Sequence, residues 1–289
     1  MTTAPDDPFV THRSLLFTVA YEILGSAADA EDVLQESWLR WAAADRSEVR
    51  DARAYLVRTV TRQSLNRLRT LARRREDYVG EWLPEPLLTT HDVAEDVVLA
   101  ESVSMAMLTV LETLGPTERA VFVLREVFDM PYGEIAEAVG KPAATVRQIA
   151  RRARGHVAAR RPRVRVSPSE QREVVERFLA ALHTGELQEL LAVMAPDVVL
   201  VADGGGIVAA ALTPIRGAHT VAKLLATANR AALATAAVWF NGAPAGRVEF
   251  DGEPAAVSLE LADGKITRIY VVRNPHKLTR IDHPARLTR

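Results

Sequence analysis

The chain has 289 residues, 48% of them hydrophobic, which is enough to form the cores of about two or three domains. It contains no cysteine, and this excludes disulfides, cysteine-bound zinc and thiol nucleophiles. The first residues do not form a basic segment followed by an apolar one, and no apolar run approaches the roughly 18 residues that span a bilayer. We therefore expect a soluble cytoplasmic protein without a membrane partner.

The charges are unevenly distributed along the chain. The 36 basic and 37 acidic residues nearly cancel, so the net charge of −1 does not by itself indicate a nucleic-acid-binding protein. However, residues 50–75 contain nine arginines and one acid, residues 76–137 contain fourteen acids and two arginines, and residues 147–165 contain eight arginines and no acid. Two basic segments are therefore separated by an acidic one.

The hydrophobic pattern changes near residue 166. Upstream, apolar residues recur at helical spacing, which predicts an all-α part. Downstream, β-branched runs predict an α+β part. The runs are separated by dipeptides typical of tight hairpin turns, namely Asn241-Gly242, Asp251-Gly252 and Asp263-Gly264.

Two segments have the composition of linkers. Residues 160–168 are rich in Arg, Pro and Ser and lack apolar periodicity, so we predict a linker between the all-α and α+β parts. Residues 76–92 contain Trp82-Leu83-Pro84-Glu85-Pro86-Leu87, whose two prolines forbid a continuous helix. A second linker is therefore predicted inside the all-α part.

An acidic helix is predicted after a cap at Ser26 or Asp29. Its apolar residues share one face, and acids gather toward its start, where they interact favourably with the helix dipole. The acidic and polar side chains are Asp29, Glu31, Asp32, Gln35 and Glu36. Taken alone, this pattern favours an ordinary solvated face.

The next helix, predicted from Asp51 to about Arg73, carries a face that we call the arginine face. Side chains placed 100° apart bring Tyr55, Arg58, Arg62, Asn66, Arg69 and Arg73 onto this face. Like charges on one face repel one another, and few acids are near enough in sequence to neutralise them. Nucleic-acid phosphates would relieve this repulsion, while Tyr55 and Asn66 could stack on or hydrogen-bond exposed bases.

Three predicted helices between residues 115 and 157 form the second basic surface. Gly115-Pro-Thr-Glu-Arg119 opens the first, Pro131 starts a shorter one that Gly140 closes, and the third begins at Ala143. A supporting helix, a tight turn and a helix with a basic outer face are typical of a helix-turn-helix. The side chains predicted to contact DNA are Arg147, Gln148, Arg151, Arg152 and Arg154. The alternative is a basic helical hairpin that packs on an acidic partner.

Motifs in three places of the all-α part follow one another in a specific order. They are Asp29-Ala-Glu-Asp-Val-Leu-Gln-Glu-Ser-Trp38, Ala54-Tyr-Leu-Val-Arg58 with Leu65-Asn-Arg67, and Leu114-Gly-Pro-Thr-Glu-Arg119 with the helix-turn-helix. Over residues 8 to about 160 the chain resembles an extracytoplasmic-function sigma factor of bacterial RNA polymerase, a non-enzymatic family. The resemblance implies a sigma domain 2 over residues 1–75, a linker over 76–107 and a sigma domain 4 over 108–160, acting in promoter-specific transcription initiation.

The resemblance also implies roles for the residues above. The acidic helix, through Asp29, Glu31, Asp32, Gln35 and Glu36, would bind the β′ clamp of core RNA polymerase, whose β flap is a further expected partner. The arginine face would engage the minus-ten promoter element as it melts, and the helix-turn-helix would bind the minus-thirty-five element. The chain departs from the family at Pro142, where Ser is common, and at Ile149, where a basic residue is common.

The sequence pattern after residue 168 predicts helices that lead into a curved antiparallel sheet. The predicted elements are helices over 170–183, 186–194 and from Gly217 to about Arg230, a strand over 198–202, and four further β segments ending with 265–272. This order resembles the SnoaL-like, cone-shaped α+β fold. It implies a regulatory domain over residues 169–289, joined by a linker over 161–168.

Three short motifs resemble those of the SigJ-type subgroup of these sigma factors, in which the appended domain regulates the sigma factor in cis. The implied regulatory interface contains Trp82, Leu83, Pro84, Glu85, Pro86, Leu87, Asp203, Gly204, Gly205, Gly206, Asn274, Pro275 and Lys277. We expect Trp82 and the prolines to form an apolar plug, and the glycines to allow a close backbone approach. The chain departs from the subgroup at Ile207, where Lys often follows the glycines, and at His276, where an acid is usual.

Other functions remain open from the sequence. A SnoaL-like pocket enzyme, or a sensor of an unknown small ligand, could have a DNA-binding helical half, and Asp203 with His219 is the acid-base pair to test for the enzyme. An independent DNA-binding repressor is a third hypothesis. We expect no metal and no cofactor, because the chain has neither an HExxH motif nor a dense cluster of acids with ligand spacing.

Overall fold

The computed structural model describes residues 7–160, 166–227, 234–250 and 252–289; the side chains of residues 48 and 72–76 also lie outside the description. The chain forms two compact units. The first contains residues 1–76, 107–161 and 286–289, and the second contains residues 77–106 and 162–285. No helix among the described residues is both long enough and apolar enough to cross a bilayer.

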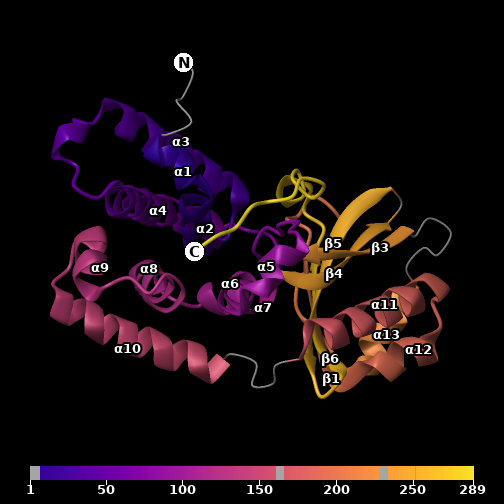
Figure 1. Ribbon diagram of the computed structural model, residues 1–289. Coiled ribbons are helices and arrows are strands. Elements are labelled where there is room, and N and C mark those ends of the chain that lie inside the picture. The colour runs from indigo at the N-terminus through magenta and orange to yellow at the C-terminus, as the bar shows by residue number, and fades with distance from the viewer. Residues whose placement is uncertain (1–6, 161–165, 228–233, 251) are drawn as a thin grey trace. The chain divides into compact units, whose positions relative to one another are not determined.

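The first unit begins with a group of helices around α2 (Figure 1), and most side chains of α2 are buried. Ser26 caps α3 by accepting a hydrogen bond from the Asp29 amide at 3.2 Å, which confirms one of the two predicted caps. Residues of the C-terminus belong to this unit as well, because Leu287 is buried and the Thr288 amide donates to Thr18 Oγ1 at 3.1 Å. The elements are α1 (Pro8–Thr11), α2 (Arg13–Leu24), α3 (Ala27–Ala43), the 3₁₀ turn η1 (Arg46–Glu48) and α4 (Ala52–Glu76).

A helix-turn-helix completes the first unit, as predicted. Gly140 ends α9 in the left-handed conformation with φ of 66°, and α10 then buries Val146, Ile149, Ala150, Ala153 and Val157. The burial of Ile149 explains how an apolar residue can occupy this position. The elements are α7 (Met105–Leu111), whose first two residues belong to the second unit, α8 (Pro116–Phe122), the π-helical turn η2 (Val123–Val127), α9 (Tyr132–Val139) and α10 (Ala143–Arg160).

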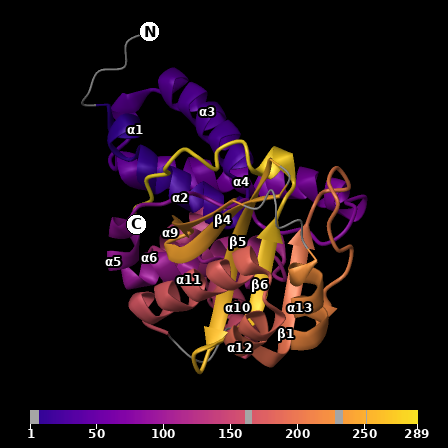
Figure 2. The ribbon, with the colours of Figure 1, turned by 90° about the vertical axis from the view of Figure 1, so that its right-hand side faces the viewer.

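The second unit is built on one sheet with strand order β2-β1-β6-β5-β4-β3. The predicted antiparallel sheet is confirmed for four of the strand pairings, but β1 and β6 pair in parallel; Figure 2 shows these two strands side by side. The short strand β2 was not predicted. The strands are β1 (Met194–Asp203), β2 (Ile215–Arg216), β3 (Ala234–Phe240), β4 (Ala243–Phe250), β5 (Glu253–Ala262) and β6 (Lys265–Val272).

The hairpin turns are the ones that the dipeptides predicted. Asn241 and Gly242 have φ of 55° and 70°, and Asp263 and Gly264 have φ of 51° and 70°, which suit two-residue turns between twisted strands. Gly252, between β4 and β5, has φ of 81°, while its neighbour Asp251 lies outside the described residues.

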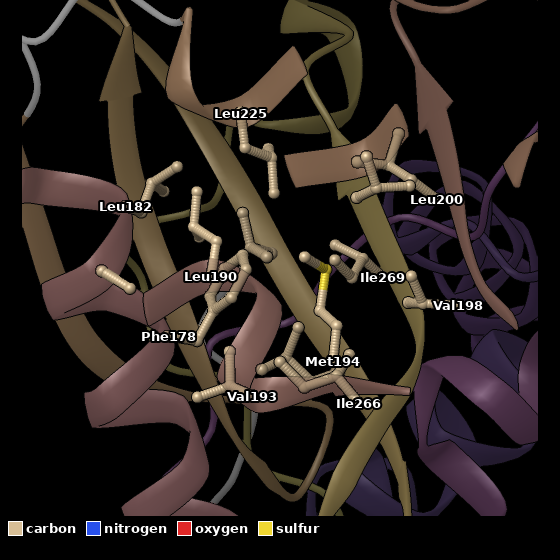
Figure 3. Close-up of a cluster of buried hydrophobic side chains, with 14 of the residues drawn as sticks. Phe178, Leu182, Leu190, Val193, Met194, Val198, Leu200, Leu225, Ile266 and Ile269 are labelled. Carbon is tan, nitrogen blue, oxygen red and sulfur yellow. The ribbon is translucent and has the colours of Figure 1, made fainter. Parts of the chain in front are cut away.

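One face of the sheet is covered by three helices. Apolar side chains from these helices and from the sheet pack together between them, as the cluster in Figure 3 shows. Phe178, Leu190, Met194 and Ile269 are among the buried members. The helices are α11 (Pro168–Thr184), α12 (Leu187–Val193) and α13 (Ala218–Ala226); residues 228–233, at the predicted end of the last helix, lie outside the described residues.

The opposite face of the sheet is covered by residues from the acidic middle of the chain. A second apolar cluster joins Leu83 and Met105 to Phe240, Tyr270 and Leu278. The segment predicted as a linker therefore contributes to a core of the second unit. It contains α5 (His91–Glu95) and α6 (Val97–Val103), which were not predicted, and the 3₁₀ turn η4 (Pro275–Lys277) follows the sheet.

Candidate nucleic-acid interface and linker-binding site

The arginine face lies on α4, but two of its arginines already contact another helix of the same unit. Arg58 forms an ion pair with Glu137 of α9, and Arg62 Nη2 donates to the Glu137 carbonyl oxygen at 2.7 Å. Asn66 and Arg69 are exposed and are joined by a hydrogen bond of 3.1 Å. The sequence predicted few neutralising acids close to these arginines, but Arg58 pairs with an acid 79 residues away in sequence. The side chain of Arg73 lies outside the described residues.

Tyr55 lies at the start of the same face. Its half-buried ring is tilted against Trp41, with ring centroids 5.7 Å apart, and the Arg58 guanidinium lies 5.9 Å from its centroid. The ring is therefore held in place by two neighbours.

The acids of helix α3 form ion pairs with two arginines, of which Arg67 belongs to a quoted motif and Arg13 does not. Arg67 lies 2.7 Å from Asp29 and 2.9 Å from Asp32, and Arg13 lies 2.6 Å from Glu31. Burial opposes the charge of Arg67, but the hydrogen bond to Asp29 and the nearby carboxylates raise its pKa above the ordinary value. Gln35 and Glu36 are exposed on the same helix.

The outer face of α10 is exposed as predicted. The side chains on it are Arg147, Gln148, Arg151, Arg152 and Arg154, opposite the buried apolar side. Two of them contact α9: the Arg147 guanidinium lies 5.7 Å from the Tyr132 ring centroid, and Arg154 Nη2 lies 3.5 Å from the Tyr132 hydroxyl. Arg154 also lies 3.2 Å from Glu126. A basic, solvent-facing helix of this kind can contact phosphates and base edges.

In the second unit, Asp203 is the centre of a site that holds the residues after α4; we call it the linker site. Asp203 is fully buried at the end of β1. Its carboxylate accepts hydrogen bonds from the Tyr78 hydroxyl at 2.5 Å, the Leu83 amide at 2.9 Å and Lys277 Nζ at 2.6 Å. Two of these three donors come from the linker segment, so a single carboxylate fixes its course.

The partner cation, Lys277, is held on several sides. Its ammonium group donates to the Leu83 carbonyl oxygen at 2.5 Å and lies 3.9 Å from the Trp82 ring centroid and 5.0 Å from that of Tyr78. A desolvated ammonium over two aromatic faces and beside a carboxylate is strongly stabilised. Burial and the hydrogen bond to Asp203 raise the pKa of Tyr78 above its ordinary value, so its hydroxyl remains a donor.

The glycine run makes room for this site. Gly205 has φ of 61°, and a Cβ there would come within 2.3 Å of Asn274 Nδ2. Asn274 in turn donates to the Tyr78 hydroxyl at 2.8 Å. The expectation of a close backbone approach is therefore met at Gly205, since only glycine fits both the left-handed conformation and the narrow gap.

A second anchor holds the linker at the turn between β3 and β4. The Leu87 amide donates to Asn241 Oδ1 at 3.1 Å, and the Asn241 amide donates back to the Leu87 carbonyl oxygen at 2.9 Å. Asn241 Nδ2 also donates to the Val103 carbonyl oxygen at 3.0 Å, and the Thr89 amide donates to the Trp239 carbonyl oxygen at 2.9 Å. The linker is thus bound at both ends of its proline-containing segment.

The structure brings together the residues of the three motifs. Leu83, Pro84, Glu85, Pro86 and Leu87 are buried. Trp82, however, is only half-buried and lies over Lys277, so the prediction of an apolar plug applies to its neighbours. Ile207 and His276 are exposed and Pro275 begins η4. Tyr78 and Asn241 were missed as linker contacts, because a tyrosine outside any motif and an ordinary turn sequence carry no such signal.

The Asp203 and His219 pair does not form an acid-base site within the cone. The Asp203 carboxylate faces the linker and is surrounded by donors, and His219 is exposed on α13. The interior side of the sheet carries the apolar cluster of Figure 3, and Asp203 is not part of that cluster. The enzyme hypothesis therefore loses the pair on which it depended.

Two known families match parts of the chain. The family described as Sigma-70 region 2 matches residues 9–74, which contain α2 to α4. The family described as Sigma-70, region 4 matches residues 104–157, which contain the helix-turn-helix.

Relatives cover nearly the whole chain. The ECF RNA polymerase sigma factor SigJ of Mycobacterium tuberculosis strain H37Rv is 36% identical, with 94% of this chain and 92% of the relative covered. The probable ECF RNA polymerase sigma factor SigI of the same strain is 34% identical, with 92% of each chain covered. The crystal structure of M. tuberculosis SigJ superposes with a TM-score of 0.75 and 34% identity, covering 93% of this chain and 96% of that one.

Proposed function

The chain belongs to the extracytoplasmic-function sigma factors, which direct promoter-specific initiation by RNA polymerase, and we propose how its surfaces divide this work. The α3 residues Asp29, Glu31, Asp32, Gln35 and Glu36 bind the β′ clamp of core polymerase. The arginine face of α4 binds the minus-ten element, and the outer face of α10 binds the minus-thirty-five element while its domain meets the β flap. The protein acts in the cytoplasm and carries no catalytic step.

The observation that carries this proposal is the division of α10 into two faces. Its apolar side chains are buried, and its five predicted DNA-contacting side chains are exposed at the end of a helix-turn-helix. Exposed arginines that lie together repel one another, and DNA phosphates would neutralise them. The acids that lie near them, Glu126 and Glu118, each approach a single arginine.

We further propose that the second unit modulates initiation in cis through the linker. The linker follows the domain that contains the arginine face and precedes the one that contains the helix-turn-helix. The linker site holds it by the Asp203 and Asn241 anchors. Because this interaction is intramolecular, tethering favours it without a separate regulatory protein. The state of the linker therefore affects how far the two DNA-binding domains can move apart.

Run-off transcription with purified core polymerase tests the division of work. Arg147→Ala/Arg151→Ala is expected to reduce promoter-specific transcripts at least tenfold, because each lost base or phosphate contact costs about 1 kcal/mol or more. Arg58→Ala/Arg62→Ala is expected to reduce them similarly by slowing promoter melting.

The matched control is Arg160→Ala. Arg160 is also exposed on α10 but lies outside the predicted contact surface, so its loss should change transcript yield less than twofold. If both double variants transcribed the promoter as well as the unmodified chain does, the assignment of these surfaces to DNA would be wrong.

A further inference from the structure

Glu137 connects the two DNA-binding regions of the first unit. It lies on α9, within the residues that match Sigma-70 region 4, and it makes two polar contacts with α4, within the residues that match region 2. Its carboxylate pairs with Arg58, and its carbonyl oxygen accepts from Arg62 at 2.7 Å. Two arginines that we assign to promoter DNA are thus bound by one residue of the same chain.

The chemistry of this contact resembles that of a phosphate. A carboxylate and a backbone carbonyl at the C-terminal end of a helix both present partial or full negative charge. Glu137 is two residues from the end of α9, so its carbonyl oxygen belongs to the last turn and is available to an external donor. The N–H donors of Arg58 and Arg62, which would otherwise bind DNA phosphates, can therefore be satisfied by these acceptors on α9.

The contact also fixes how close the two DNA-binding surfaces are. The other end of α9 carries Tyr132, which contacts Arg147 and Arg154 of α10. Tyr132 and Glu137 are five residues apart, which is about 8 Å along a helix. The arginine face and the outer face of α10 therefore both contact the same short helix, α9. The minus-ten and minus-thirty-five elements are about 25 base pairs apart, or roughly 80 Å of B-form DNA.

We propose that Glu137 is a phosphate surrogate that holds the two DNA-binding regions in a closed arrangement until promoter DNA and polymerase displace it. This inference rests on the proposed function of the arginine face. In the closed arrangement, Arg58 and Arg62 are occupied and the two faces cannot reach both elements at once. When the two regions separate, Arg58 and Arg62 exchange their contacts with Glu137 for contacts with DNA phosphates. The free-energy cost of breaking the Glu137 contacts is therefore largely offset once DNA is bound.

The test uses the full chain with donor and acceptor dyes at Thr70→Cys and Ala158→Cys, both exposed positions; the absence of native cysteine makes this labelling specific. Glu137→Gln and Glu137→Lys are each compared with Glu134→Gln, a substitution at an exposed position of the same helix. In the free chain, both Glu137 variants should shift the population toward longer distances. They should also raise affinity for a short fluorescein-labelled single-stranded DNA about fivefold. Glu134→Gln should do neither.

Unchanged distances and unchanged DNA affinity in both Glu137 variants would overturn the lock. Circular dichroism spectra that match those of the unmodified chain would show that the variants are folded. The lock and the proposed function fail separately: a failed lock leaves the transcription defects of Arg58→Ala/Arg62→Ala intact. If those defects are absent instead, it is the assignment of the arginine face that fails, whatever the dyes report.

Discussion

Replacing Asp203 by asparagine should lower the free energy of unfolding of the second unit by about 3 kcal/mol. The substitution leaves the Lys277 ammonium beside a neutral amide in a largely buried place, and an unpaired buried charge costs about 3–5 kcal/mol. It also removes one of the two carboxylate oxygens that the Tyr78 hydroxyl, the Leu83 amide and Lys277 share. The linker should separate from the sheet before the rest of the unit unfolds.

Urea denaturation followed by tryptophan fluorescence measures this loss, because Trp82 lies over Lys277 and Trp239 lies beside the second anchor. Amide hydrogen exchange at Leu83 and Leu87 should accelerate in the variant. Asp197→Asn is the matched control, since Asp197 is exposed on the same strand. The double variant Asp203→Asn/Lys277→Met should recover part of the loss. Equal stability of Asp203→Asn and Asp197→Asn would show that the linker site does not stabilise the unit.

The second large effect is expected in the first unit at Arg119, within the Leu114 to Arg119 motif. Arg119 is only 2% exposed, its Nε donates to the Glu22 carbonyl oxygen of α2 at 2.8 Å, and it pairs with Glu112. Arg119→Met fills similar space but leaves these buried acceptors without their donor. We expect a loss of about 3 kcal/mol in the free energy of unfolding.

Arg119→Lys separates charge from geometry. A lysine keeps the charge but cannot donate to Glu22 and Glu112 through a planar fork, so an intermediate loss is expected. Arg50→Met removes an exposed arginine of the same unit and should change stability by less than about 0.5 kcal/mol. Thermal or urea unfolding monitored by circular dichroism measures all three. A loss for Arg119→Met no larger than that for Arg50→Met would contradict the structural role of the buried arginine.

Local patterns predicted most of the helical unit. The capping residue Ser26, the proline and glycine around α9 and the apolar spacing of α10 are all read within a few residues of the element that they define. The same holds for the turn at Asn241 and Gly242, whose left-handed conformations follow from the residue types.

What could not be predicted depends on residues far apart in sequence. Arg58 pairs with Glu137, 79 residues away, and Asn241 accepts a hydrogen bond from the Leu87 amide, 154 residues away. No short stretch of sequence contains both partners of either contact. The parallel pairing of β1 with β6 has the same origin. The linker looked like a spacer because its prolines exclude a helix, but an extended apolar segment can equally well cover a sheet face. Its buried leucines show that it does so.

Run-off transcription by Asp203→Asn and Trp82→Ala tests most directly whether the linker site controls initiation, once hydrogen exchange has shown that the linker is released. With equal amounts of core polymerase, we predict that both variants change transcript yield from the promoter by at least threefold, while Asp197→Asn matches the unmodified chain. A released linker with unchanged transcript yield in both variants would contradict control in cis.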